Sequence, residues 1–229
     1  MNAKVSEIFV SYQGEGPYAG SRQLFVRFFG CNMACGYCDT RLDSYKSFTR
    51  EGLLGKIMDF EDDYNELAIT GGEPLLQAEF LDRFLPLYKK HRPQRIYLET
   101  NGTRYREFAA IKKHVDIVSM DIKLPSTDPG KPDYMDDHER FLAAASSKEL
   151  IVKAVVSDTT AMDDIKRMAF MLSGMDGDIC VVLQPVTPIN GLFRTPDGEM
   201  LQFFKGHIAK ETGKDVMVMG QLHKKVGIR

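Results

Sequence analysis

The sequence predicts an α/β protein built as a partial (β/α)6 barrel, with parallel strands and short N- and C-terminal extensions. Short apolar runs alternate with longer stretches of helical period, which is typical of parallel strands joined by helices. Polar and glycine-rich residues follow directly after several of these runs, as they do where an active site lies at the carboxyl ends of parallel strands. About six such units are too few for an eight-fold barrel.

Seven apolar runs are strand candidates, and six amphipathic stretches are helix candidates. The strand candidates are LFVRFFG (24–30), ELAIT (66–70), RIYLET (95–100), DIVSMDIK (116–123), ELIVKAVV (149–156), DICVVLQ (178–184) and DVMVMG (215–220). The helix candidates lie near Thr49–Phe60, Leu76–His91, Tyr105–His114, Met135–Ser146, Ala161–Ser173 and Asp197–Thr212.

The length and composition predict one domain spanning residues 1–229. The net charge of -2 argues against a nucleic-acid-binding surface. No apolar run is long enough to cross a membrane, and the N-terminus lacks the layout of a signal peptide. We therefore expect a cytoplasmic protein with neither a nucleic acid nor a membrane as partner.

Three of the four cysteines, Cys31, Cys35 and Cys38, lie close together with C-x-x-x-C-x-x-C spacing. Structural zinc sites and ferredoxin-type clusters normally use four protein ligands. A distant histidine such as His91 or His114 remains a possible fourth ligand, but three thiolates and one open iron position is the more economical interpretation. Cys180 stands alone in an apolar run, which favours a core role.

Two further features point to a ligand at the strand ends. Gly71-Gly72-Glu73-Pro74 follows a strand candidate, and paired glycines let the backbone approach a ligand closely. Arg27 lies inside the apolar run LFVRFF, where an unpaired charge is costly, so a buried acid or a ligand must neutralise it.

The cysteine spacing, with Tyr37 just before the third cysteine and the GGEP motif downstream, resembles the radical S-adenosylmethionine (SAM) superfamily. The resemblance implies a [4Fe-4S] cluster on Cys31, Cys35 and Cys38, with SAM chelating the fourth iron. It also implies that the reduced cluster cleaves SAM to a 5′-deoxyadenosyl radical, so the cofactors carry the difficult chemistry.

Within that superfamily the chain resembles the 7-carboxy-7-deazaguanine synthase family over nearly its whole length. The matching features are Gln13-Gly14-Glu15-Gly16, Arg27, Cys38-Asp39-Thr40, TGGEPLLQ, ETNGT and LHKKVGIR. The resemblance implies ring contraction of 6-carboxy-5,6,7,8-tetrahydropterin to 7-carboxy-7-deazaguanine with loss of ammonia. This step leads to the 7-deazapurines of queuosine or archaeosine.

The same resemblance implies roles for individual residues. The SAM contacts it implies are Tyr37, Cys38, Asp39, Gly72, Glu73, Asp121, Lys123 and Gln184. The substrate contacts it implies are Tyr12, Gln13, Gly14, Glu15, Arg27, Thr70, Glu99, His223 and Arg229. Thr40 is the implied Mg²⁺ ligand, a flavodoxin- or ferredoxin-like protein the implied electron donor, and a homodimer the implied assembly. The segment SMDIKLPS departs from the Ser-Pro-Lys of many bacterial relatives, and Asp121 and Lys123 take the corresponding place at the end of this strand.

Other functions stay open at this point. A glycyl-radical-enzyme activase would share the cluster but would not need the QGEG loop or Arg27. A metal-binding adaptor or an electron carrier would hold a metal centre without cleaving SAM.

Overall fold

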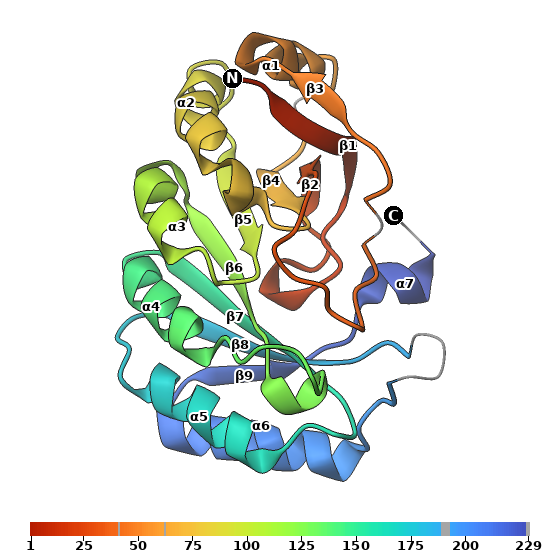
Figure 1. Cartoon of the computed structure of the whole chain (residues 1–229), viewed down its shortest axis with the longest axis vertical. Helices are drawn as coiled ribbons and strands as arrows, with labels where there is room; N and C mark the ends of the chain where they lie inside the picture. The colour runs from red at the N-terminus through yellow and green to blue at the C-terminus, as the bar shows by residue number, and fades with distance from the viewer. Residues whose placement is uncertain (41, 62, 189–192, 228–229) are drawn as a thin grey trace.

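The computed structural model describes residues 1–40, 42–61, 63–188 and 193–227, and these form one curved sheet covered by helices (Figure 1). The nine strands lie in the order β3-β1-β2-β4-β5-β6-β7-β8-β9. Their bounds are β1 (Ala3–Tyr12), β2 (Arg22–Phe28), β3 (Lys46–Phe48), β4 (Glu66–Gly71), β5 (Arg95–Thr100), β6 (Ile117–Ile122), β7 (Glu149–Val156), β8 (Ile179–Pro185) and β9 (Asp215–Val218).

Strand β2 and the strands from β4 to β9 pair in parallel. Strands β1 and β3 add an antiparallel edge next to β2. Because β3 and β9 are the two ends of the strand order and do not pair with each other, the barrel is open. The predicted partial barrel is confirmed, as are all seven strand candidates.

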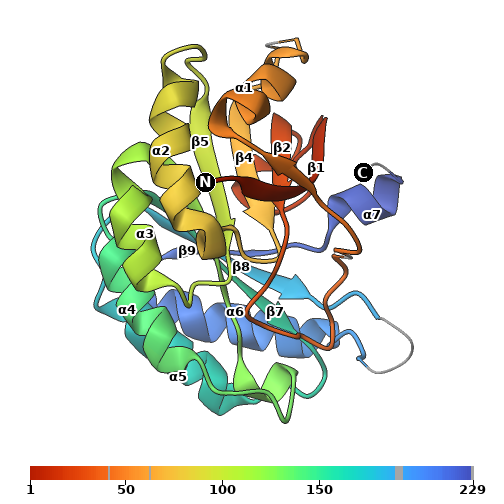
Figure 2. The same cartoon turned by 45° about the horizontal axis from the view of Figure 1, so that its top comes forward.

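The six predicted helices are also confirmed, with ends that differ by a few residues. The helices are α1 (Arg50–Met58), α2 (Ala78–Lys89), α3 (Tyr105–Ile111), α4 (Met135–Ala145), α5 (Met162–Ser173), α6 (Gly198–Thr212) and α7 (Leu222–Val226). Helices α2 to α6 cover one face of the sheet, and α7 lies on the opposite side (Figures 1 and 2). No helix in the part of the chain that the structure describes has the length and apolarity required to cross a bilayer.

Strand β1 and the short β3 were not among the strand candidates, nor was α7 among the helix candidates. Most of β1 is only half-buried, because β1 lies near the open edge of the barrel, and its apolar alternation is correspondingly weak. Strand β3 and helix α7 are too short for any periodicity to show.

The inner face of the sheet is built in layers along the strands. One apolar residue from each of six adjacent strands forms a small buried cluster: Phe25, Ala68, Tyr97, Ile117, Ile151 and Val182. Side chains two residues apart on a strand point to the same face. The next inward-facing layer is therefore polar, and all six of its members line a cavity: Arg27, Thr70, Glu99, Ser119, Lys153 and Gln184.

Candidate active site

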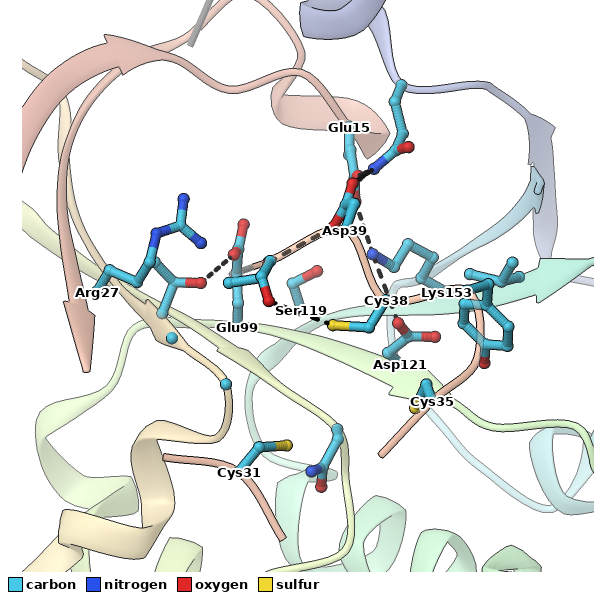
Figure 3. Close-up of a pocket in the computed structure, with 18 of the residues that line it drawn as sticks. Glu15, Arg27, Cys31, Cys35, Cys38, Asp39, Glu99, Ser119, Asp121 and Lys153 are labelled. Atoms are coloured by element: carbon cyan, nitrogen blue, oxygen red, sulfur yellow. Dashed lines mark hydrogen bonds and ion pairs between the residues drawn. The ribbon is translucent and has the colours of Figure 1, made fainter. Parts of the chain in front are cut away.

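A cavity of about 740 Å³ opens at the carboxyl ends of the strands. The polar layer forms its floor, and the loop of the three clustered cysteines forms part of its wall (Figure 3). Among the predicted site residues whose side chains the structure describes, every one except Glu73 lines this cavity. The structure thus brings together residues that lie far apart in the sequence.

The three thiols of the cysteine loop all line the cavity. Within the described residues, no group of three potential ligands converges on a single ion. A cubane cluster does not need such convergence, because each thiolate binds a different iron atom. Burial raises the pKa of Cys31 and of Cys35. Bound iron would have to offset this effect, since the thiolate is the ligand form.

Polar contacts hold the cysteine loop to its neighbours. The side chain of Asn101 donates to that of Asn32 at 2.9 Å, and the backbone N–H of Gly36 donates to Asp128 at 2.7 Å. The Tyr37 ring packs edge-on against Phe193, and the Lys123 ammonium lies 5.3 Å from the centre of the same ring. These contacts fix the position of the cysteine loop.

Gly72 brings the TGGEP turn against the start of the cysteine loop. A Cβ on Gly72 would lie 2.4 Å from the carbonyl oxygen of Gly30 and 2.7 Å from the Cβ of Cys31, so no other residue fits. The second glycine of the motif is therefore required for the packing of this turn against the cysteine loop, in addition to any role in binding a ligand.

Glu73 departs from its predicted place. Its side chain is fully buried and does not line the cavity. The carboxylate instead accepts hydrogen bonds from the backbone N–H groups of Leu75 and Asn101 and from the Thr100 hydroxyl. Burial raises the pKa of Glu73 to about 7. Glu73 thus joins the ends of β4 and β5, and the predicted contact of its side chain with SAM has no support in this geometry.

Arg27 is neutralised by an acid, as we expect for a charged residue in an apolar strand. Its Nε donates to Glu7 on the neighbouring strand β1 at 2.8 Å, and its guanidinium lies 5.7 Å from the Phe9 ring centre. Because Glu7 uses Nε, the two terminal nitrogens of Arg27, which lines the cavity, keep the geometry that suits a planar anion.

Glu99 forms the centre of a second polar group on the floor. Its two carboxylate oxygens accept from the Gln13 amide at 2.9 Å and the Thr70 hydroxyl at 2.6 Å. The Gln13 side-chain oxygen in turn accepts from the backbone N–H groups of Gly14 and Glu15, which fixes the QGEG loop. This group presents acceptors and amides to the amino and carbonyl edge of a heterocycle.

Alternating charges form a row in the cavity, of which Figure 3 labels Glu15, Lys153 and Asp121. Lys153 lies 2.6 Å from Glu15 and 3.6 Å from Asp121, and Lys123 lies 2.7 Å from Asp121. Burial alone would raise the pKa of Asp121, but Lys123 and Lys153 outweigh it and lower the pKa. The row therefore holds two ionised acids and two cations.

The segment before α7 closes one side of the site. Gln221 donates to Glu15 at 2.8 Å and to Asp39 at 3.0 Å, and Lys224 pairs with Asp39 at 2.5 Å. The predicted contacts of the His223 side chain and of Arg229 lie outside the described residues.

Two buried acceptors of the cavity have no hydrogen-bond partner among the described residues, namely Asp121 Oδ1 and Gln184 Oε1. Unpaired buried acceptors are costly, so they indicate a bound ligand that carries donors. SAM carries an ammonium, an exocyclic amino group and two ribose hydroxyls, and the residues present therefore fit it.

Several known proteins are similar to this chain in sequence and in fold. Residues 25–169, more than half of the chain, match the model of the radical SAM superfamily. A 7-carboxy-7-deazaguanine synthase from Geobacter sulfurreducens is 38% identical over 81% of this chain and 82% of its own length. Another from Methanothermobacter thermautotrophicus is 33% identical over 100% of this chain and 99% of its own.

The chain belongs to the 7-carboxy-7-deazaguanine synthase family. In fold it is similar to the crystal structure of QueE from Escherichia coli, with a TM-score of 0.62 at 18% identity, over 95% of this chain and 94% of that one. Membership of the radical SAM superfamily implies a [4Fe-4S] cluster and SAM as cofactors. The predictions of fold and family are confirmed.

Several cavity residues of this family member were not predicted. They include Glu7, Phe9, Asn101, Ser119, Lys153, Gln221 and Lys224. Of these, Lys153 had a sequence signal of its own, because it interrupts the apolar run ELIVKAVV as Arg27 interrupts LFVRFF.

Proposed function

We propose that this protein converts 6-carboxy-5,6,7,8-tetrahydropterin to 7-carboxy-7-deazaguanine with release of ammonia. The observation that supports this most is the convergence of the cysteine loop, Arg27 and the Gln13–Glu99 group on one cavity, in a chain that belongs to this synthase family. An activase that acts on a protein glycine would not need a guanidinium and an amide pair on the cavity floor.

In this proposal the substrate lies over the β1–β2 and β4–β5 side of the cavity. The terminal nitrogens of Arg27 hold the pterin carboxylate, and Gln13, Thr70 and Glu99 hold the amino-pyrimidinone edge. Tyr12, the Gly14 backbone and Glu15 flank the ring, and all three residues line the cavity. His223 and Arg229 remain predicted contacts.

The cofactors occupy the side of the cavity next to the cysteine loop. Cys31, Cys35 and Cys38 hold the cluster, and Tyr37, Asp39, the Gly72 backbone, Asp121, Lys123 and Gln184 surround SAM. When bound, the reduced cluster and SAM supply the one-electron chemistry that starts the reaction. The protein's own contribution is to fix the substrate at the correct distance and to exclude water.

Mg²⁺ is proposed at Thr40, which lines the cavity. A single hydroxyl suffices only because Mg²⁺ keeps waters and accepts substrate oxygens. The support is the chemistry of the anionic substrate, whose carboxylate can supply the remaining oxygen ligands.

We also propose a flavodoxin- or ferredoxin-like electron donor, a homodimer, one functional domain over residues 1–229, and a cytoplasmic location. The single sheet that runs through the chain supports one domain. The free thiols at the cluster site support a reducing compartment.

The test is an anaerobic assay of the reconstituted protein with reductant, SAM, Mg²⁺ and 6-carboxy-5,6,7,8-tetrahydropterin. We expect mass spectrometry to detect 7-carboxy-7-deazaguanine only when all three cysteines are present. Formation of 5′-deoxyadenosine without that product would show that the substrate assignment is wrong.

A further inference from the structure

Lys153 is a charged residue in the middle of an apolar strand. Its neighbours on β7, Val152 and Ala154, are fully buried on the face that the helices cover. Because side chains alternate along a strand, Lys153 points to the opposite face, into the cavity, where its side chain is 18% exposed. Desolvating an ammonium is costly, so this position needs partners.

The partners of Lys153 are two carboxylates from distant parts of the chain. Its Nζ lies 2.6 Å from Glu15 Oε2 and 3.6 Å from Asp121 Oδ2. Glu15 follows β1, whereas Asp121 lies near the end of β6. The two carboxylates are close enough to repel each other, and Lys153 is the cation between them.

These two carboxylates belong to different halves of the proposed site. Glu15 lies in the QGEG loop beside Gln13, on the substrate side. Asp121 pairs with Lys123 near Tyr37, on the cofactor side. Lys153 is therefore the one ammonium that contacts both sides among the described residues.

We propose that Lys153 is a positioning residue that couples the binding of SAM to the binding of the pterin. SAM brings a sulfonium near Asp121, and its positive charge competes with Lys153 for that carboxylate, so that the Lys153 ammonium pairs with Glu15 alone. The Glu15 carboxylate is then held in one orientation for the pterin, so each ligand strengthens the binding of the other. This inference rests on the proposed function, because it assigns the two sides to those two ligands.

A role for Lys153 as a proton donor fits less well. Burial alone would lower its pKa, but Glu15 and Asp121 outweigh that effect and hold the pKa well above the ordinary value. Such an ammonium keeps its proton near neutral pH and acts as a fixed charge.

The experiment measures binding without turnover. Cluster-loaded protein with Mg²⁺ and no reductant is titrated anaerobically with 6-carboxy-5,6,7,8-tetrahydropterin, with and without saturating SAM. We expect SAM to lower the pterin Kd by roughly 5-fold or more in the unmodified protein. In Lys153→Met, which keeps most of the side-chain volume and loses the charge, we expect the ratio of the two Kd values to be near one.

Lys148→Met is the matched control, because Lys148 directly precedes β7 and its Nζ donates to the Val115 carbonyl outside the cavity. This variant should keep the full ratio. The reciprocal titration, of SAM with and without pterin, must give the same factor for each protein. Lys153→Arg provides a second variant if Lys153→Met does not fold, and it should keep a ratio above two because it keeps the cation.

Three results would overturn the inference: a ratio near one in the unmodified protein, an unchanged ratio in Lys153→Met, or a ratio near one in folded Lys153→Arg. If the unmodified protein makes 7-carboxy-7-deazaguanine in any of these cases, only the inference fails. If it neither binds the pterin nor forms the product, the proposed function fails as well.

Discussion

At the scale of single residues, the site depends on side chains whose chemistry is costly unless a partner is present. Arg27 and Lys153 each place a cation in an apolar strand, and each is neutralised by an acid, Glu7 of the neighbouring strand for the first and Glu15 of the QGEG loop for the second. The clustered thiols make only long local contacts, since the Cys31 sulfur accepts from the Met33 N–H at 3.4 Å and the Cys38 thiol donates to the Thr40 carbonyl at 3.7 Å, which is consistent with their use as ligands.

Replacing any one of the three clustered cysteines with Ala should abolish the cluster. Two thiolates hold a cubane poorly, so we expect iron and sulfide content to fall to background and the brown colour to be lost. Cys180→Ala is the control, because Cys180 is half-buried in β8 and does not line the cavity. An intact cluster in a clustered-cysteine variant would contradict the ligand assignment.

Arg27→Ala should keep the cluster and lose substrate recognition. Removing one partner of a hydrogen-bonded charge pair costs about 2–5 kcal/mol, so we expect kcat/KM for the pterin to fall by roughly 30-fold or more. Binding of a tetrahydropterin that lacks the carboxylate should be nearly unchanged, as measured by anaerobic calorimetry. An equal loss for both pterins would place the carboxylate elsewhere.

At the scale of strands and loops, buried titratable side chains join the ends of adjacent strands. Glu73 connects the end of β4 to the loop after β5. His138 of α4 connects that loop to the end of β6, since its Nε2 accepts from the Lys123 N–H at 3.0 Å and its Nδ1 lies 3.2 Å from the Gly102 carbonyl oxygen. Only the neutral Nδ1–H imidazole satisfies both partners.

Glu73→Gln should change the pH dependence of stability. In the folded protein the Glu73 pKa is about 7, above its ordinary 4.5, so its contribution is complete below pH 4.5 and is lost as the pH rises toward 7. Relative to the unmodified protein, the variant's free energy of unfolding should therefore rise by about 3 kcal/mol between pH 4.5 and pH 8. Denaturant unfolding of the cluster-free proteins measures this, and a constant difference would contradict the raised pKa.

His138→Gln should show the opposite dependence. Burial lowers the His138 pKa to about 4 from 6.5, so its contribution is present above pH 6.5 and is lost as the pH falls toward 4. The variant should gain about 3 kcal/mol relative to the unmodified protein between pH 7 and pH 4. Thermal unfolding over this range would reveal the gain, and its absence would mean that His138 is charged when folded.

At the scale of the whole molecule, the open barrel brings both ends of the chain to one cavity. Gln221 contacts Glu15, which lies 206 residues earlier, and it also contacts Asp39 of the segment after the third cysteine. The Thr187 hydroxyl donates to the same side chain at 2.9 Å. One amide thus joins the substrate loop, the cysteine segment and the end of β8.

Gln221→Ala should therefore weaken substrate binding without removing the cluster. We expect the pterin KM to rise by roughly 5- to 10-fold, since the loss of one or two hydrogen bonds costs about 1–1.5 kcal/mol. The exposed Gln202 of α6 does not line the cavity, and Gln202→Ala should leave KM unchanged. Steady-state assays with iron content as a check would separate this outcome from a loss of cluster.

Much of the fold and most of the site could be predicted from the sequence. The seven parallel strands followed from local apolar runs, and Arg27 and the cysteines followed from residue types that rarely occur in such places without a ligand. The same reasoning from residue type indicates a partner for Lys153, whereas the family resemblance assigns no role to that residue. Ser119, a small hydroxyl among apolar neighbours, carries no comparable signal.

What the sequence by itself determined is the succession of the seven parallel strands along the chain, the cysteine loop and the family, because each depends on short-range spacing and residue type. Only the tertiary structure decided that Glu73 turns away from the cavity to bind backbone groups, and that Glu15, Asp121 and Lys153 meet. Those contacts depend on the register between strands and the curvature of the open sheet. A one-residue shift in register would turn Asp121 of β6 or Lys153 of β7 to the other face of its strand, and no local pattern records which residues then come together.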